Sequence, residues 1–517
     1  MKKTFYISLL LTTLIYSQQQ QHVPWPSLAD SPWPVLRGDM QGTGRSKYIG
    51  PRTNNVIWRK DMPLGVLFGP VIGYDDVLYM GERALSPANV NYFYAVDKNG
   101  NNLWTFETIT SLPNNGGPIV AKDSTIYFLS ASARLYALSS DGSLKWSASG
   151  INANWRFHPM AKNGDIYLAI GDTLVIISPI GAIKNKIPIL HLCPPIVFST
   201  GGDTMFFKTG GLSEQPGNIN ASDLQGNIYW THHFAFHNWG IPLVDNSNKV
   251  YVFGSDSINP ANRFLYCFNP DGTVNWQYQL SGFLDHAAPT IDKNGNILLN
   301  ARKIINSEER NCIISLDYYG NENWVMPFEG DWDDHYINHG LVCDAEGKIY
   351  CGSSYQGNFY CIDSTGEILW TLDLGEYEYD SCPAIGSDGT LYIGLHISSL
   401  FQNHQQNLIA IRDEVNAVEP PGTEILNYRL EQNYPNPFNS FTTIRYALPK
   451  LSKISLKIYN LSGQRVKTLI EEEQGSGWKT VNWDGTDDNG KELNSGVYFY
   501  KMQAGNYSAA RKLMLIR

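Results

Sequence analysis

The stretch YAVDKNGNNLW, residues 94–104, decides the fold because its pattern recurs five more times along the chain. The other copies are YALSSDGSLKW (136–146), NASDLQGNIYW (220–230), YCFNPDGTVNW (266–276), ISLDYYGNENW (314–324) and YCIDSTGEILW (360–370). In every copy a Gly stands four residues before the final Trp, and an Ala, Cys or Ser stands nine residues before it. The Gly ends a polar turn, where it adopts the positive φ that other residues resist. Each copy therefore predicts two strands joined by a tight turn, with the Trp on the second strand.

The copies recur with a period near 45 residues, which is typical of a β-propeller. Another pair of short strands precedes each copy, and four strands make one blade. A degenerate copy over residues 158–185 keeps Gly181 but has Asn185 in the Trp position, and a last copy from Pro383 stops before its Trp strand. The early segment NNVIWRK, with Trp58, has no upstream partner strands, so we expect it to complete the last blade and leave no free edge. The fold class predicted is all-β, an eight-bladed propeller, with seven blades as the alternative if the degenerate copy forms no blade.

This repeat resembles the tryptophan-docking repeat of quinoprotein-like (PQQ-like) propellers, over roughly residues 33–415. The segment WPVLRGDMQGTGRS, residues 33–46, is similar to the lead-in that precedes the first blade in that family. The family contains dehydrogenases and non-catalytic scaffolds, so the resemblance implies a fold rather than a function.

The two ends of the chain predict export. Lys2 and Lys3 precede an apolar run over residues 5–16, which is too short for a membrane helix and suits a signal peptide over residues 1–17. The propeller then covers residues 18–412, and the Pro-, Gly- and Glu-rich segment 413–426 is a linker. Short strands bounded by turn signals predict a small β-sandwich over residues 427–517.

That sandwich resembles an immunoglobulin-like type IX secretion sorting domain. The resemblance is carried by LEQNYPNPFNSFTTIRYALP (430–449), VNWDGTDDNGKELNSGVYFYKMQAG (481–505) and RKLMLIR (511–517). It implies that the type IX machinery is a partner and that the protein is secreted or held at the outer cell surface of a Gram-negative bacterium.

Charge argues against nucleic-acid partners. Residues 18–424 hold 24 basic and 41 acidic side chains, a net charge of −17, whereas residues 425–517 hold 13 basic and 8 acidic, a net charge of +5. Nucleic-acid binding requires a basic face, which the acidic propeller does not supply. After the signal peptide no run of 18 or more apolar residues follows, so we expect no transmembrane segment.

Two residue types invite a metal or disulfide interpretation. The seven cysteines contain no CxxC pair, and Cys351 and Cys361 could either form a disulfide across a hairpin or serve, like the others, as small buried residues. Asp484, Asp487 and Asp488 could suggest calcium, but the twelve-residue loop with its closing Glu is absent, so we expect a polar hairpin turn there.

A ligand site is predicted at one end of the central channel, where the segments entering the innermost strand of each blade gather. These segments are rich in aromatic, amide and charged side chains, which suit a glycan or a protein ligand in a concave pocket. The candidate ligand contacts are Trp155, Arg156, His158, His237, Trp239, Asp285, His286, Asp331, Trp332, His335, His339, Tyr377, Tyr379 and Asp380. The alternatives are that these loops are merely polar surface, or that residues 331–339 supply carboxylates and imidazoles to a metal ion.

The function predicted is that of a secreted or surface-located, non-catalytic binding or scaffold protein. The alternative is a quinone-dependent dehydrogenase or another extracellular enzyme built on propeller loops, although the vicinal cysteine pair common in those dehydrogenases is absent. An outer-membrane assembly scaffold would need a lipidated Cys after the signal peptide, and the first cysteine is Cys193. We assign no catalytic residues and expect no cofactor, neither pyrroloquinoline quinone nor calcium.

Overall fold

The computed structural model describes most of the chain after the predicted signal peptide. The described residues are 19–62, 65–66, 69–81, 92–108, 117–130, 134–149, 159–210, 216–237, 240–282, 287–328, 340–353, 357–375, 382–395, 407–413, 428–430, 433, 436, 438–439, 442–475, 477–505 and 507–516. The chain forms two compact units, Met1–Glu414 and Val415–Arg517, whose boundary lies within the predicted linker. No helix among the described residues is long and apolar enough to cross a membrane.

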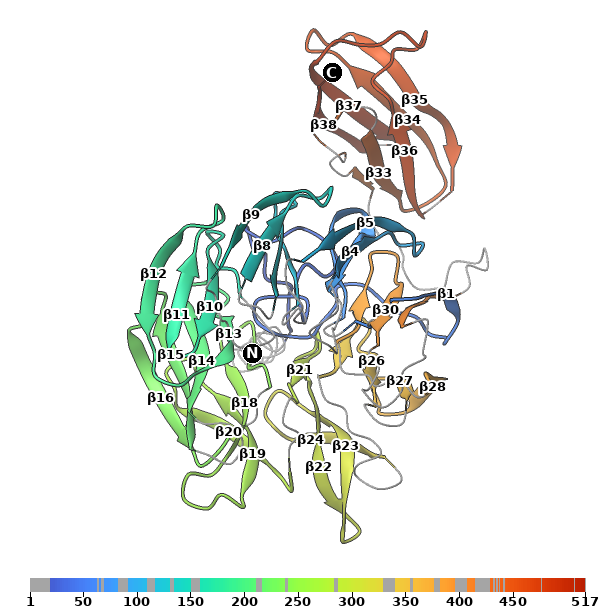
Figure 1. Cartoon of the computed structure of the whole chain (residues 1–517). Coiled ribbons are helices and arrows are strands. Elements are labelled where there is room, and N and C mark those ends of the chain that lie inside the picture. The colour runs from blue at the N-terminus through green and yellow to red at the C-terminus, as the bar shows by residue number, and fades with distance from the viewer. Residues whose placement is uncertain are drawn as a thin grey trace, which may run out of the picture. The chain divides into compact units, whose positions relative to one another are not determined.

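The described part of the first unit forms eight separate antiparallel sheets arranged around a centre (Figure 1), which we call blades 1 to 8 in chain order. Six of these sheets begin with an inner strand of two residues, and every sheet ends with the outer strand that carries the repeat's Trp position. Blade 1 also contains the 3₁₀ helix η1 (Tyr74–Asp76) between its first two strands.

The strands of blades 1 to 4 follow the chain without crossovers. Blade 1 contains β2 (Val71–Ile72), β3 (Leu78–Gly81), β4 (Tyr92–Val96) and β5 (Asn102–Glu107), and blade 2 contains β6 (Ile119–Val120), β7 (Ile126–Ser130), β8 (Arg134–Leu138) and β9 (Leu144–Ala148). Blade 3 contains β10 (Ile166–Ile170), β11 (Thr173–Ile177) and β12 (Ile183–Pro188), and blade 4 contains β13 (Leu192–Phe198), β14 (Thr204–Gly210), β15 (Gly217–Asp223) and β16 (Ile228–Phe234).

Blades 5 to 7 repeat this order, and blade 8 combines both ends of the propeller sequence. Blade 5 contains β17 (Leu243–Val244), β18 (Val250–Ser255), β19 (Arg263–Phe268) and β20 (Val274–Leu280), and blade 6 contains β21 (Thr290–Ile291), β22 (Ile297–Ile305), β23 (Glu308–Leu316) and β24 (Glu322–Pro327). Blade 7 contains β25 (Val342–Cys343), β26 (Ile349–Gly352), β27 (Asn358–Ile362) and β28 (Ile368–Asp373), and blade 8 contains β29 (Ala384–Ile385), β30 (Leu391–Gly394), β31 (Leu408–Ile411) and β1 (Val56–Lys60).

The repeated Trp and Gly join six pairs of neighbouring blades. The Trp104 indole of blade 1 lies against Gly142 of blade 2, where an added Cβ would stand 2.6 Å from Trp104 Cδ2, and its Nε1 donates to Ser140 O at 2.8 Å. Only a residue without a side chain can accept an indole this closely, and Gly142 also has a φ of 85°. The same pairing of an indole with a turn glycine recurs for Trp58 with Gly100, Trp146 with Gly181, Trp230 with Gly272, Trp276 with Gly320 and Trp324 with Gly366.

Blade 3 departs from the rule at its outer strand. Asn185 is exposed, and Ile187, two residues further along β12, lies against Gly226 of blade 4 instead of an indole. Asn185 pairs with the large residue Ile176, whereas Trp104 pairs with Ala95, the small residue of the repeat. The degenerate copy therefore reverses the sizes of the two paired residues and docks with an aliphatic side chain.

The predicted completion of the last blade by the early strand is confirmed. Trp58 of β1 pairs with Ala410 of β31, and its indole reaches blade 1 by donating to Lys98 O at 2.9 Å. β1 and β30 lie in the same sheet although their colours mark opposite ends of the propeller sequence (Figure 1).

The second unit is a two-layer β-sandwich. One sheet contains β32 (Arg429–Leu430), β33 (Thr442–Leu448) and β36 (Gly477–Trp483), and the other has the order β35 (Arg465–Gln474), β34 (Ser452–Tyr459), β37 (Gly496–Ala504), β38 (Tyr507–Leu515). Alternate residues of β34 and β37 are buried, as expected for sheets with one face in a core. Trp483, Tyr500 and Ile444 lie in that core. The predicted all-β fold, a propeller followed by a sandwich, is confirmed.

Candidate functional site

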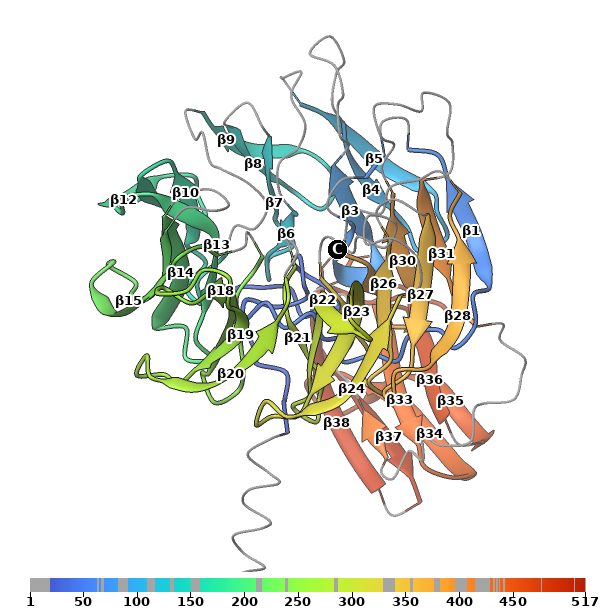
Figure 2. The same cartoon turned by 90° about the horizontal axis from the view of Figure 1, so that it is seen from below.

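The segment before the first blade, residues 19–50, lies inside the ring (blue in Figures 1 and 2). Its first part runs past blades 6, 5, 3, 2 and 1. The hydrogen bonds that show this are, in that order, Gln20 N to Lys293 O, Gln21 N to Asn246 Oδ1, Trp25 Nε1 to Met160 O, Ala29 N to Val120 O and Ser31 Oγ to Ile72 O. Its second part then turns back and passes the blades in chain order. We call residues 19–50 the central segment.

Main-chain hydrogen bonds attach the second part of the central segment to the inner strands. Ile72 N of blade 1 donates to Trp33 O at 2.7 Å, and the same type of bond joins blades 2, 4, 5, 6 and 7 to successive carbonyls. The remaining bonds are Val120 N to Pro34 O, Phe198 N to Met40 O, Val244 N to Gln41 O, Ile291 N to Thr43 O and Cys343 N to Gly44 O. The central segment therefore satisfies backbone groups that these strands would otherwise leave unpaired.

This segment lies toward the end of the channel where the inner strands finish. Lys122 N and Ala345 N, in the turns that follow the inner strands of blades 2 and 7, donate to Ser27 O and Tyr48 O. Trp33 and Met40 are almost fully buried. The central segment thus fills this end of the channel.

Arg37 fixes the central segment to two blades. Its side chain is fully buried, Nε donates to Gly42 O at 3.0 Å, and Nη2 donates to Pro289 O at 2.5 Å and to Thr290 Oγ1 at 2.9 Å. Nη1 lies 3.5 Å from Leu341 O, so blades 6 and 7 both supply acceptors. Burial lowers the pKa of Arg37. The guanidinium remains charged, and its donors are directed at protein carbonyls, so we interpret it as a structural pin.

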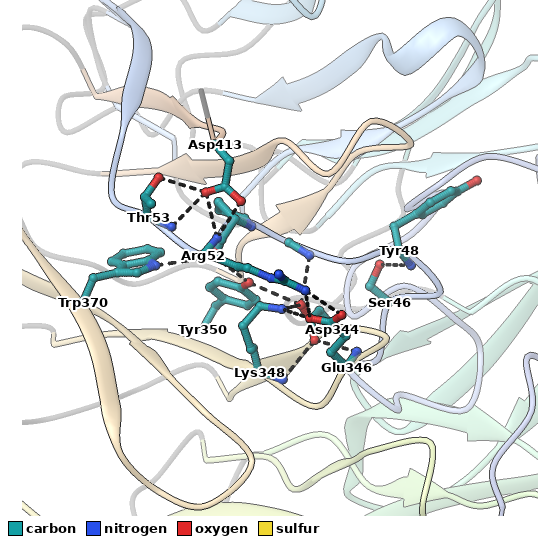
Figure 3. A network of polar contacts seen from close by, with 12 residues as sticks. Ser46, Tyr48, Arg52, Thr53, Asp344, Glu346, Lys348, Tyr350, Trp370 and Asp413 are labelled. Atoms are coloured by element: carbon teal, nitrogen blue, oxygen red, sulfur yellow. Dashed lines mark hydrogen bonds and ion pairs between the residues drawn. The ribbon is translucent and has the colours of Figure 1, made fainter. Parts of the chain in front are cut away.

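A network of charged groups clamps the end of the central segment to blades 7 and 8 (Figure 3). The buried carboxylate of Asp344 accepts from Gly50 N at 2.9 Å and pairs with Lys348 Nζ at 2.7 Å. Burial opposes the charge of Lys348, but Asp344 and Glu346 stabilise it, so the pKa of Lys348 is raised. Arg52 donates to both carboxylate oxygens of Glu346, at 2.9 and 3.0 Å.

Asp413, just after the last propeller strand, holds the start of β1. Its carboxylate accepts from Arg52 N at 2.9 Å, from Thr53 N at 2.8 Å and from Thr53 Oγ1 at 2.8 Å. Trp370 Nε1 and Tyr350 OH of blade 7 donate to Pro51 O (Figure 3). Side chains from blades 7 and 8 therefore converge on residues 50–53.

Of the predicted ligand contacts, only His237 belongs to the described residues. It is 5% exposed, forms a bridge with Gly254 of β18, and lies so close to Gly217 that an added Cβ there would stand 2.2 Å from its Cδ2. Its assignment to a ligand site stays a prediction. The others lie outside the described residues: Trp155, Arg156, His158, Trp239, Asp285, His286, Asp331, Trp332, His335, His339, Tyr377, Tyr379 and Asp380.

The structure corrects the proposed cysteine hairpin. Cys351 pairs with Tyr360 and Cys361 pairs with Tyr350, so the two cysteines are one residue out of register and point to opposite faces of the sheet. All seven cysteines are free thiols and buried. Burial raises the pKa of Cys361 to about 12 and that of Cys312 to about 11, which keeps these thiols protonated and unreactive.

The Asp-rich segment of the second unit is a hairpin turn, as predicted. Asp487 Oδ1 accepts from Asn489 N and Lys491 N at 2.9 Å, and Asp484 Oδ1 accepts from Thr486 N and its hydroxyl. No group of three or more potential metal ligands occurs within the described ranges.

Sequence reasoning missed the role of the central segment, although the segment was noticed as a family lead-in. The available signal was three of its glycines, Gly38, Gly42 and Gly44, which have φ values of 83°, 67° and 66°. Closely spaced glycines indicate a backbone that turns sharply or approaches other groups closely. At Gly44 an added Cβ would stand 2.8 Å from Arg37 Nη2.

These features define a β-propeller protein whose channel is filled at one end by its own chain, followed by an Ig-like domain. The FlgD Ig-like domain family matches residues 440–508. No curated protein matches the chain.

Among solved structures, similar folds occur in several propellers. The Dos1 propeller has a TM-score of 0.49 and 10% identity, over 68% of this chain and 93% of that one. Sqt1 from Chaetomium thermophilum has a TM-score of 0.49 and 9% identity, over 70% of this chain and 99% of that one. BamB from Moraxella catarrhalis has a TM-score of 0.43 and 14% identity, over 65% of this chain and 99% of that one. At these identities the likeness concerns the fold alone.

Proposed function

We propose that the protein is an exported, non-catalytic binding propeller that takes a glycan or protein ligand at one end of its channel. The observation that supports this is the one-sided filling of the channel: the central segment occupies the end where the inner strands finish. A ligand is then left with the opposite end, where we expect from the sequence aromatic side chains such as Trp155, Trp239 and Trp332. Concave sites of this kind suit ligand binding.

The buried cation of the central segment is not available to a quinone cofactor. Pyrroloquinoline quinone carries three carboxylates and would require cations with free donors. Arg37, the buried cation of the central segment, directs its donors at Gly42 O, Pro289 O and Thr290 Oγ1. We therefore derive no redox step for this protein.

The binding proposal is tested with a glycan array and the mature full-length protein. We expect discrete binding that Trp332→Ala weakens about tenfold or more, as for an aromatic residue central to an interface. The matched control is Tyr229→Ala, because Tyr229 is 61% exposed on the outer strand of blade 4. An array without any binding would contradict the proposal of a glycan ligand. Equal loss of binding in both variants would contradict the proposed position of the site.

Export through the type IX pathway is the second part of the proposal. It is supported by the sequence motifs of residues 427–517 and by the separate β-sandwich that the described residues of this part form. We expect deletion of residues 427–517 to leave the propeller in the periplasm. Surface exposure of the truncated protein in a protease-shaving assay would contradict this part and leave the binding proposal intact.

A further inference from the structure

The outer face of the larger sheet in the second unit carries a belt of cations. One cross-strand row contains Arg465 of β35, Tyr459 of β34, Phe499 of β37 and Lys512 of β38. The next row contains Thr468, Lys457, Lys501 and Ala510 on the same four strands. Successive residues of a strand alternate between faces, and the residues between these, such as Ile458 and Tyr500, are buried in the core.

Like charges face each other within this belt. Lys457 and Lys501 are direct cross-strand partners, an arrangement that destabilises a sheet. Glu471 offsets one of them, since its Oε1 lies 3.0 Å from Lys457 Nζ. No ion pair of Lys501 occurs among the residues that the structure describes. A sheet that keeps such a pair on its surface favours an anionic partner.

Beyond the belt, the same end of the sheet is apolar and exposed. Leu461 follows Tyr459 in the β34–β35 turn and is 72% exposed, while Phe499 and Met514 are each 37% exposed. Ile516, which continues the outward-facing positions of β38, is 49% exposed. Phe499 lies in the row of Arg465 and Lys512. Leu461, Met514 and Ile516 lie beyond that row, on the side away from Lys457 and Lys501. Along the strands, the exposed face of this sheet therefore changes from polar to cationic to apolar.

We propose that this end of the sandwich is a peripheral docking surface for an anionic lipid membrane. Apolar side chains that enter the boundary between headgroups and acyl chains, followed by cations at headgroup level, are the pattern of interfacial binding. Lys and Arg add attraction to anionic headgroups. A soluble polyanion would use the cations but gain little from exposed Leu461, Met514 and Ile516. The inference is independent of the ligand proposed for the propeller channel.

The test is sedimentation of the full-length mature protein with vesicles of phosphatidylcholine and phosphatidylglycerol, compared with vesicles of phosphatidylcholine alone. We expect binding only to the anionic vesicles, weakened by added salt. The double variant K501Q/K512Q should bind about 30-fold more weakly, roughly fivefold for each lysine. Phe499→Ser should also weaken binding while leaving the salt dependence in place.

Lys491→Gln is the matched control, because Lys491 is an exposed lysine of the same unit that lies in the Asp487 turn. It should bind like the wild type, and circular dichroism checks that every variant is folded. The proposal is overturned if the wild type does not prefer anionic vesicles, or if Lys491→Gln loses as much binding as K501Q/K512Q. Binding of soluble heparin that depends on Lys501 and Lys512, without vesicle binding, would assign the surface to a polyanion and equally overturn the lipid proposal.

Discussion

Replacing Trp58 tests whether the ring is closed by one indole between the first and last blades. Trp58 is mostly buried, packs against Tyr392 of blade 8 and Gly100 of blade 1, and donates to Lys98 O. Trp58→Ala removes about 100 Å² of buried apolar area, worth about 2.5 kcal/mol. The lost hydrogen bond adds about 1 kcal/mol.

The expected loss of about 3.5 kcal/mol converts into a modest shift in melting temperature, because the propeller is large. Its unfolding entropy is about 0.8 kcal/mol/K for roughly 400 residues, so the propeller transition should move down by about 4 °C. Differential scanning calorimetry of the full-length protein separates this transition from that of the sandwich. Trp58→Phe keeps a ring but loses the donor, so its shift should be about a third as large.

Trp276→Ala is the matched control, since Trp276 makes the same contact with Gly320 within a continuous stretch of chain. It should lower the melting temperature similarly. Only Trp58→Ala should speed hydrogen exchange in β1 and β31, because β1 is joined to blade 8 by no covalent turn. Unchanged exchange in these two strands, together with an unchanged melting temperature, would refute the closure argument.

Three further perturbations test other parts of the propeller. Burial lowers the pKa of Lys208 to about 8 from 10.5, so between these pH values the folded state binds fewer protons than the unfolded state. The free energy of unfolding should therefore rise by about 3 kcal/mol as the pH increases through this range. Lys208→Met should flatten that rise when unfolding is measured as a function of pH. Gly272→Ala should cost more than 2 kcal/mol in chemical denaturation, because its φ is 86° and an added Cβ would stand 2.6 Å from Trp230 Cγ, whereas Gly171→Ala, with no atom nearby, should cost about 1 kcal/mol. Arg37→Met should lower the free energy of unfolding by about 3 kcal/mol and speed hydrogen exchange of the central segment, since three carbonyl groups lose a buried partner. Hydrogen exchange unchanged from the wild type would contradict the structural role of Arg37.

The repeat made the fold predictable because each of its residues has one physical task. Gly142 must accept an indole and adopt a positive φ, so its spacing from Trp104 and Trp146 is fixed by geometry rather than by composition. The same logic predicted that Trp58 belongs to the last blade, since an outer strand without upstream partners needs another sheet.

Side-chain pairing within a hairpin was harder to predict than the hairpin itself. Symmetry about a turn suggested that Cys351 and Cys361 face each other, but a one-residue register shift places them on opposite faces. The position of the central segment inside the ring was not predicted, for a different reason. Its contacts, such as that of Arg37 with Leu341, join residues 304 positions apart, and no local periodicity reports such a contact.

The completion of blade 8 by β1 has a consequence for biogenesis. Residues 56–60 are synthesised before any blade, yet their partners at residues 408–411 emerge only when the propeller is almost complete. Contacts of such long sequence separation require a large loss of chain entropy before they stabilise the fold, which slows folding. Until the last blade is made, the early strand and the central segment have no complete ring to enter, so the propeller can become a cooperative unit only after residues 408–411 have been synthesised.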